Sequence, residues 1–258
     1  MTKLWLAATA LSTALMTSGC VIVVDGDDDG GSKMRRDARS SDGYIVLDRD
    51  GDYTRLSGDL NLRGHIGGDL SLVSGDVDID RLDVGGDVSI AAGDVNFSGS
   101  ADGEVSIAGG DVRWNGQAHD ELSIAAGDLH VSGRIAGEAA LAAGDMDVDA
   151  TFMDELSAQA GTLRFSGEVS GPVRLVAINE IRRNRAYSGD EGLVAISGRL
   201  HDGGEVCAIR VTVTASARID GRLVVYAESE PDVAGGARTD DLVYMPRNGR
   251  DCDDLIGD

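Results

Sequence analysis

Aromatic residues, proline and cysteine are all scarce in this chain. Aromatics make up 4% of its 258 residues, and it contains only 3 prolines and 3 cysteines. A core so poor in aromatics has to be filled by Val, Ile, Leu and Ala, which suit strands, while the 36 glycines supply frequent bends. We therefore expect many short strands and no helical bundle.

Positive charge is scarce as well. Lys and Arg number 23 against 45 Asp and Glu, so the net charge is -22 at pH 7. Binding of phosphate groups requires clustered Lys and Arg, and this balance therefore argues against nucleic acid or an anionic membrane surface as a partner. Cations and basic surfaces stay open as partners.

Long apolar runs are confined to the start of the chain. Lys3 precedes an apolar segment at residues 4–16, and small residues follow it. This order is typical of an export signal, which we place at residues 1–19. Because no other segment approaches the length of a transmembrane helix, we expect membrane contact only through a lipid.

The segment MTSGC, residues 16–20, resembles the lipobox of bacterial lipoproteins. The resemblance covers residues 1–20 and implies that Cys20 is acylated and becomes the mature N-terminus of a lipid-anchored protein of the bacterial cell envelope. The residue after this cysteine is not Asp, and in this the chain resembles lipoproteins that are sent to the outer membrane. Thr17 stands where Leu is commonest, so ordinary signal-peptidase cleavage after Gly19 remains an alternative.

Cysteine parity agrees with a lipid on Cys20. Removing Cys20 leaves Cys207 and Cys252 as an even pair in an exported, oxidising setting. We predict a disulfide between them, with two unpaired thiols as the alternative. Residues 20–43 then form the lipidated N-terminus and a flexible acidic tether, since 24–43 is dense in Asp, Gly, Ser and Arg and has no apolar periodicity.

A repeat dominates the chain from residue 52. "EVSIAGGDVRWNG" and "ELSIAAGDLHVSG" follow one another, and each coil opens with an acid. Self-similarity at such a period is the signature of a solenoid, in which each unit buries its apolar side by stacking on the next. The step is 17 residues, broken once by 18, and the opening acids are Asp52, Asp69, Asp87, Glu104, Glu121, Glu138 and Glu155.

Three apolar segments alternate with polar residues in each coil. Val105 and Ile107 form one, Val112 and Trp114 the next, and Ala118 belongs to a shorter third. Period-two alternation indicates strands with one face inward. We predict an all-β, narrow, three-sided parallel β-solenoid (β-helix), expected to be right-handed. Bends with Gly at positive φ are expected at Ser98-Gly99, Asn115-Gly116, Ser132-Gly133 and Ser166-Gly167.

The repeat blurs after Gly171. Residues 178–192 interrupt it, but residues 205–221 again form a unit that opens with an acid. We expect the solenoid to cover 44–243, with regular repeats at 52–171 and irregular ones at 172–243. The tail, residues 244–258, is predicted to cap the open end of the sheets, tied to the rod by Cys252.

Two columns of acids run along the predicted rod. The second contains Asp59, Asp76, Asp94, Asp111, Asp128 and Asp145. Repulsion costs roughly 0.9 kcal/mol per adjacent pair in bulk-like water, which exposed bends can bear. We interpret the acids as turn acceptors that keep the rod soluble. Calcium shared along Asp94, Asp111, Asp128 and Asp145 is the alternative; otherwise no metal or cofactor is expected.

No residue pattern recommends catalysis. His65, His119, His130 and His201 lack metal-ligand spacing, no Ser or Cys lies in a nucleophile motif, and every coil repeats the same acids. We therefore expect no catalytic residues and interpret the histidines as surface or bend residues.

The repeat block resembles the bactofilin-like and adhesin-like solenoids of bacteria, through its short Gly-rich units of the type "GDVSI". The resemblance covers about half of the chain and implies a non-catalytic envelope scaffold or binding rod that self-associates or binds surface polymers. An enzyme acting on envelope polysaccharide is the alternative. It would need a groove whose acids differ from their counterparts in other coils.

Overall fold

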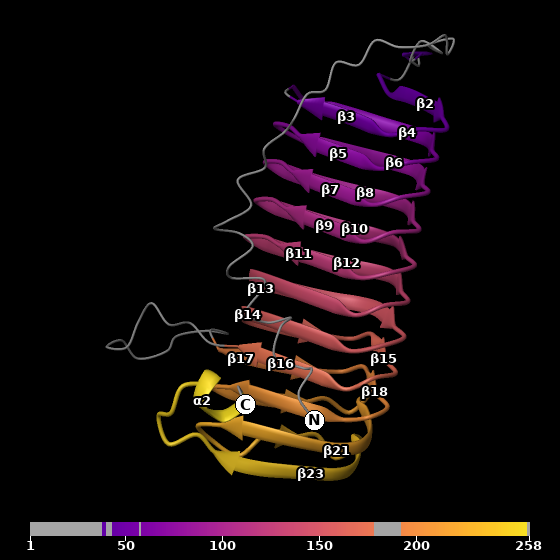
Figure 1. Cartoon of the computed structure of the whole chain (residues 1–258). Coiled ribbons are helices and arrows are strands. Elements are labelled where there is room, and N and C mark those ends of the chain that lie inside the picture. Colours follow the sequence, from indigo (N-terminus) through magenta and orange to yellow (C-terminus); the bar gives the residue numbers. More distant parts are fainter. Residues whose placement is uncertain (1–37, 40–42, 57, 178–191, 257–258) are drawn as a thin grey trace. The chain divides into compact units, whose positions relative to one another are not determined.

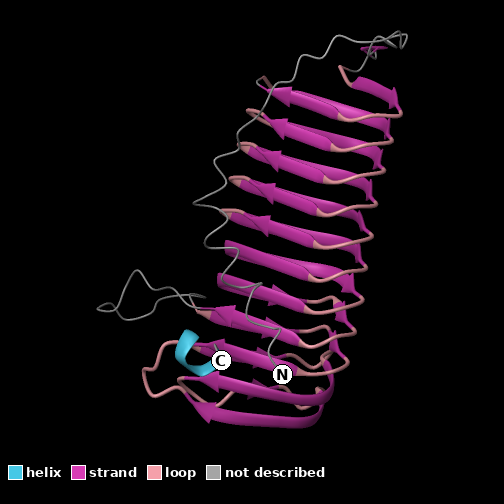
Figure 2. Cartoon of the chain, in the orientation of Figure 1, coloured by secondary structure: helices cyan, strands magenta, loops and turns pink. Residues whose placement is uncertain are grey.

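The computed structural model describes residues 38–39, 43–56, 58–177 and 192–256. The export signal, Cys20 and most of the tether lie outside these residues, as does the interruption at 178–191. The predicted fold is confirmed: the described chain is a parallel β-solenoid of about 11 turns with almost no helix. Figures 1 and 2 show the stacked coils, each strand pairing with its counterpart one coil away.

The first side of each coil is a short strand that follows the opening acid. Its inward residues, such as Leu122 and Ile124, are buried, while Ser123 between them points outward. The strands confined to this side are β3 (Tyr53–Leu56), β5 (Leu70–Val73), β7 (Val88–Ala91), β9 (Val105–Ala108), β11 (Leu122–Ala125), β16 (Val173–Ala177) and β19 (Gly204–Ala208).

The second and third sides meet at a corner that most early strands run around without a break. Trp114 lies fully buried on the second side and stacks on Phe97 of the preceding coil, with ring centroids 4.3 Å apart. The strands that span both sides are β2 (Ile45–Arg49), β4 (Leu60–Ile66), β6 (Val77–Val84), β8 (Asp94–Ala101), β10 (Asp111–Ala118) and β12 (Asp128–Ile135).

The later coils divide differently between strands. β13 (Ala139–Phe152) follows all three sides, β14 (Leu156–Phe165) covers the first two, and β21 (Arg218–Ala227) and β23 (Arg238–Pro246) run from the third side into the next first side. The remaining strands are β15 (Glu168–Val169), β18 (Arg199–Leu200), β17 (Leu193–Ile196), β20 (Arg210–Val213), β22 (Asp232–Val233) and β1 (Ala38–Arg39), which pairs antiparallel with β2.

The pairing register explains the one irregular step among the early coils. Asp80 pairs with Ser98 and Leu82 with Gly99, which leaves Arg81 without a counterpart. Arg81 has a φ of 53° and forms a β-bulge that turns its side chain away from the core. The extra residue is thus absorbed at one point, and every inward column before and after it stays in phase.

Close packing against the preceding coil requires glycine at the corner between the second and third sides, and positive φ requires it as well at two of the positions. Gly99 and Gly133 have positive φ, as predicted. At Gly116 and Gly167 that expectation is wrong, because neither has positive φ. Glycine is needed at these two positions because the preceding coil leaves no room for a side chain. An added Cβ at Gly116 would lie 2.8 Å from the carbonyl oxygen of Gly99.

The irregular coils keep the core while changing their lengths. Val173 pairs with Gly204, a step of 31 residues that spans the interruption, and Arg199 pairs with Arg218, a step of 19. Residues 205–221 therefore belong to a coil of 19 and not of 17. The inward residues Leu175, Val206 and Val225 nevertheless share one buried column, and the solenoid ends with β23.

Candidate functional site

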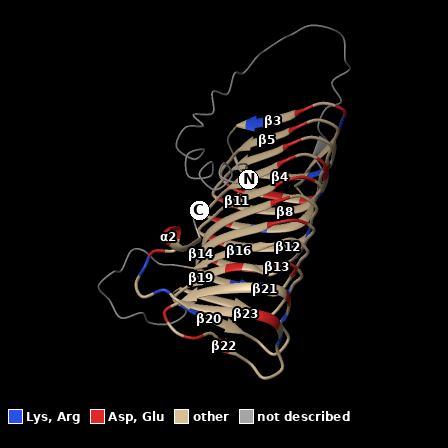
Figure 3. Cartoon of the chain, turned by 60° about the horizontal axis from the view of Figure 1, so that its bottom comes forward, with Lys and Arg blue, Asp and Glu red and all other residues tan. Residues whose placement is uncertain are grey.

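The two acid columns lie on the surface, and their aspartates up to Asp94 bind the backbone of the neighbouring coil. The Oδ1 of Asp69 accepts the N–H of Asp87 at 2.9 Å, and that of Asp94 accepts the N–H of Asp111 at 3.3 Å. These bonds join successive coils, where the sequence suggested acceptors within one turn. Figure 3 shows acidic positions recurring along the rod. These aspartates therefore contribute to stacking as well as to surface charge.

Stacking the longer glutamates has an electrostatic cost. Partial desolvation, together with the charges of Glu104 and Glu138, raises the pKa of Glu121 above its usual range. Burial and then the charge of Glu138 raise the pKa of Glu155 in the same way. The Glu121 and Glu155 carboxyl groups are thus harder to ionise than a free glutamate.

The calcium alternative gains no geometric support. Within the described ranges, no group of three or more His, Cys, Asp or Glu side chains converges as a metal site. The Oδ1 of Asp94 already accepts a backbone N–H of the next coil. Asp111, Asp128 and Asp145 follow it at one-coil intervals in the same register.

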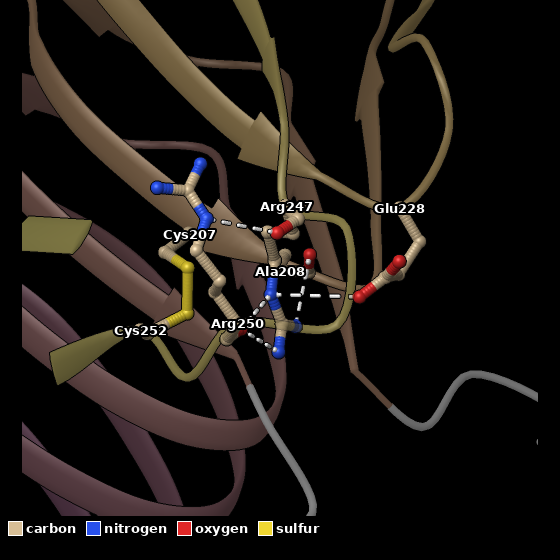
Figure 4. The surroundings of a disulfide bond; sticks show 6 residues. All are labelled: Cys207, Ala208, Glu228, Arg247, Arg250 and Cys252. Atoms are coloured by element: carbon tan, nitrogen blue, oxygen red, sulfur yellow. Dashed lines mark hydrogen bonds and ion pairs between the residues drawn. A yellow bond between two sulfur atoms is a disulfide. The ribbon is translucent and has the colours of Figure 1, made fainter. Parts of the chain in front are cut away.

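Cys207 and Cys252 form a disulfide, with Cα atoms 5.8 Å apart (Figure 4). Cys207 lies on the outer surface of β19 and pairs with Tyr226 of the next coil. The tail places Cys252 and the short helix α2 (Asp253–Ile256) against this surface, and Ile256 packs with Val176. The tail therefore covers the flank of the first side and not the open end, contrary to the predicted cap.

A buried arginine supports the turn that leads into the tail. Arg247 donates from Nη2 and Nε to the carbonyl oxygen of Arg250 at 2.8 and 3.0 Å, and from Nη1 to that of Ala208 at 3.4 Å. Glu228 lies 3.7 Å from its Nε (Figure 4). A guanidinium satisfied in this way can remain charged while buried, and it links the tail to the last coils.

Two of the histidines pair with carboxylates on the third side. His119 Nδ1 lies 2.7 Å from Asp102 Oδ1, and His201 Nε2 lies 2.6 Å from Glu168 Oε1. His201 Nδ1 also faces Asp220 at 3.9 Å. The sequence placed these histidines at the surface but did not identify their partners.

Sequence reasoning missed a hollow at the corner between the second and third sides of the later coils. It is open to solvent, has a volume of about 380 Å³ and extends over four successive coils. Its chemistry is polar and of both charge signs. The residues that line it include Asp149, Thr151, Ser166, Glu168, Ser197, Arg199, Ser216 and Arg218.

Charged residues of the hollow differ in type from the residues that occupy the same position in neighbouring coils. Glu168 follows Thr151 in its column, and Arg199, Arg218 and Arg238 follow Glu168 in register. A change of residue type along an aligned column is a signal that sequence alone contains. It was hidden here because the coil length changes from 17 to 31 and then to 19 residues between these positions.

Comparisons with protein-family models, curated proteins and solved structures gave no match for this chain. In the part of the chain that the structure describes, no helix has the length and apolar character needed to cross a bilayer.

Proposed function

We propose that this chain is a non-catalytic rod of the bacterial cell envelope, lipid-anchored at Cys20 to the outer membrane, that acts as a scaffold or adhesin-like binding protein. The observation that carries the proposal is the continuous apolar interior of the solenoid, which leaves most polar side chains of the described coils on the outside at one-coil intervals. A rod of this kind offers a long, rigid surface on which a polymer or a second chain can be held.

Three further features support this role. The pattern of an export signal and the lipobox resemblance support a location in the envelope with a tether at one end. A disulfide suits an oxidising compartment. The repeat resembles bactofilin-like and adhesin-like solenoids, whose expected roles are self-association and binding of envelope polymers, while the charge of -22 disfavours nucleic acid.

An enzyme acting on envelope polysaccharide is the second candidate. It is favoured by one observation: Asp149 and Glu168 line the same hollow, and Glu168 differs from its counterparts in neighbouring coils. Glycoside hydrolysis uses two carboxyl groups on either side of the scissile bond. Glu168 Oε1 lies 2.6 Å from His201 Nε2, however, so this carboxyl group is already engaged within the protein.

The anchor is tested by membrane fractionation of cells that express the full chain. We expect the wild type in the outer-membrane fraction and Cys20→Ala in the soluble fraction, since only the variant lacks the acylated sulfur. Cys252→Ala is the matched control, because it removes a cysteine without removing the anchor. An unmodified N-terminus by mass spectrometry in the wild type would contradict the proposal.

Binding and catalysis are separated by incubating the purified chain with protein-free envelope polysaccharide. We expect the chain to sediment with the insoluble polymer and to release no reducing ends over time. Release of reducing ends that is lost in Glu168→Gln would establish the enzyme instead. A chain that stays in the supernatant would contradict the polymer-binding role.

A further inference from the structure

The floor of the corner hollow is formed by backbone and by the small residues Ala150, Gly167 and Gly198. Gly167 and Gly198 succeed one another there, and a Cβ at either would collide with a carbonyl oxygen of the preceding coil, that of Ala150 or of Gly167. The floor is therefore low, because Ala150 contributes a methyl group and the two glycines no side chain, and the larger side chains stand at its margins. A ligand can approach the sheet closely along four coils, which at about 4.8 Å per step span roughly 14 Å.

A row of serine hydroxyls lines one margin of the floor. Ser166, Ser197 and Ser216 each donate a hydrogen bond to a carbonyl oxygen of the preceding coil, at 3.2, 3.1 and 3.0 Å. Because their protons are committed, Ser166 and Ser197 can accept hydrogen bonds from outside, whereas Ser216 Oγ already lies 3.0 Å from Thr214 Oγ1. Acceptors at one-coil intervals suit a ligand that presents hydroxyl groups repeatedly, as a saccharide does.

A column of arginines follows the other margin. Arg199 donates from Nη2 to Asp220 at 2.9 Å, so its charge is matched. Arg218 is half-buried, and among the described residues it donates from Nη1 only, to the carbonyl oxygens of Ser216 and Ala217 at 3.2 and 2.8 Å. Its Nε and Nη2 form the edge of the guanidinium that fits a carboxylate with two parallel hydrogen bonds.

Two other charged residues that line the hollow already have partners, so Arg218 is the residue there that we expect to bind an anion. Glu168 is held by His201, and Asp220 by Arg199. Asp149 lies three coils from Arg218, at the opposite end of the hollow. The hollow thus has an acceptor end for hydroxyl groups and a donor end for an anion.

We propose that this hollow binds a carboxylated saccharide, with a sugar carboxylate on Arg218 and sugar hydroxyls on the serine row and Asp149. The inference rests on the proposed function, because it names the class of envelope polymer that the rod would hold. The chain as a whole repels anions, but at physiological ionic strength charges more than about 8 Å away are largely screened. Recognition is therefore decided by the groups in the hollow.

The test is calorimetric titration of the full chain at an ionic strength of about 0.15 M. The probes are trigalacturonate and its methyl ester, which carry the same rings and differ in their carboxylates. We expect trigalacturonate to bind at least about tenfold more tightly than the ester, since a charge-assisted bidentate contact is lost in the ester.

Arg218→Gln is the decisive variant, and Arg113→Gln is its control. Both remove one positive charge from an exposed or half-exposed site, but Arg113 lies on β10, away from the hollow. We expect Arg218→Gln to abolish the preference for trigalacturonate and Arg113→Gln to keep it. Ser197→Ala should weaken both probes about threefold and leave their ratio unchanged. Melting curves establish that each variant is folded.

Three outcomes would overturn the inference: no heat with trigalacturonate, equal affinity for both probes, or an unchanged preference in Arg218→Gln. These outcomes are distinct from failure of the proposed function. If the wild type and Arg218→Gln sediment equally with envelope polysaccharide, the rod binds polymer elsewhere. If the wild type itself does not sediment, the polymer-binding role fails and the inference fails with it.

Discussion

The coils of residues 52–171 and those of residues 172–246 share one core but differ outside it. In the first group the outward column that opens the coils repeats one residue type, Asp or Glu. In the second group the same column continues with Pro172, Gly203 and Arg222. The coil length also changes, from a nearly constant 17 to steps of 31, 19 and 20.

The comparison teaches where individual chemistry enters a repeat. A column of identical groups supports stacking equally at every level, and no coil is distinguished from the next. The disulfide and the buried Arg247 belong to the later coils and their tail, and the corner hollow extends over the junction between the groups. We infer that the regular coils extend and stabilise the rod, while the irregular coils supply its specific contacts.

The largest effect is expected from breaking the core of the regular coils. Ile124→Asp would bury an unpaired charge at a fully enclosed position and lower the free energy of unfolding by several kcal/mol. Ser123→Asp, its matched control, changes the neighbouring outward residue and should be tolerated. Urea denaturation measures both. Equal tolerance of the two variants would contradict the assignment of inward and outward faces.

A smaller effect is expected from removing the disulfide of the irregular coils. Cys207→Ala combined with Cys252→Ala should lower stability by about 2–4 kcal/mol, because the link no longer restricts the unfolded chain. Hydrogen exchange should accelerate in residues 193–246 and stay slow in residues 88–165, since local opening follows local contacts. Uniform acceleration along the rod would show that the two regions unfold as one unit.

The aspartate ladder tests whether the regular coils hold a metal. Replacing Asp94, Asp111 and Asp128 together by Asn removes repulsion of roughly 0.9 kcal/mol per adjacent pair in bulk-like water and keeps the Oδ1 acceptor. We expect the triple variant to melt at or above the wild-type temperature in chelator.

Calcium provides the control for the same variant. A calcium bridge would stabilise the wild type by about 2.7 kcal/mol at a hundredfold excess over its dissociation constant. We expect Ca²⁺ to act only through ionic strength, equally on both proteins. A variant that is less stable than the wild type only in Ca²⁺ would make the ladder a metal site.

The smallest effect concerns the raised pKa of Glu121. The native state binds more protons than the unfolded state between the unfolded pKa, near 4.5, and the raised native pKa. Stability therefore falls as pH rises through this window. Glu121→Gln should flatten that dependence and raise stability at pH 7 by less than about 1 kcal/mol, since the side chain is exposed.

Thermal melting between pH 4 and pH 8 measures the dependence on Glu121. Glu230→Gln is the control, because Glu230 is an exposed glutamate outside the column. A larger flattening in this control than in Glu121→Gln would mean that general charge, and not stacking within the column, sets the pH response.

Much of the fold could be predicted because inward residues recur at a fixed interval. Val105, Leu122 and Ala139 occupy one column in the sequence pattern and one buried column in the structure. The position of the extra residue could not be predicted. An insertion at any exposed position of that coil would keep the inward residues of the neighbouring coils aligned. Only the pairing of Asp80 and Leu82 identifies Arg81 as the bulge.

The direction of the tail was also beyond the sequence. Parity paired Cys207 with Cys252, but the pattern did not indicate that Cys207 faces outward beside Val176, so a cap over the end was expected. The outward apolar residues Val176 and Tyr226, in register with Cys207, identify the flank once the coil lengths are known.

The sequence by itself determined the solenoid, its regular columns and the apolar filling of its core, because burial imposes the same demand on every coil of equal length. Only the tertiary structure decided which residues of unequal coils lie together. Ser166, Ser197 and Ser216 are 31 and 19 residues apart and still form one row. The reason is that hydrogen bonding between adjacent coils and the inward apolar side chains fix the register, whereas surface segments absorb any difference in length.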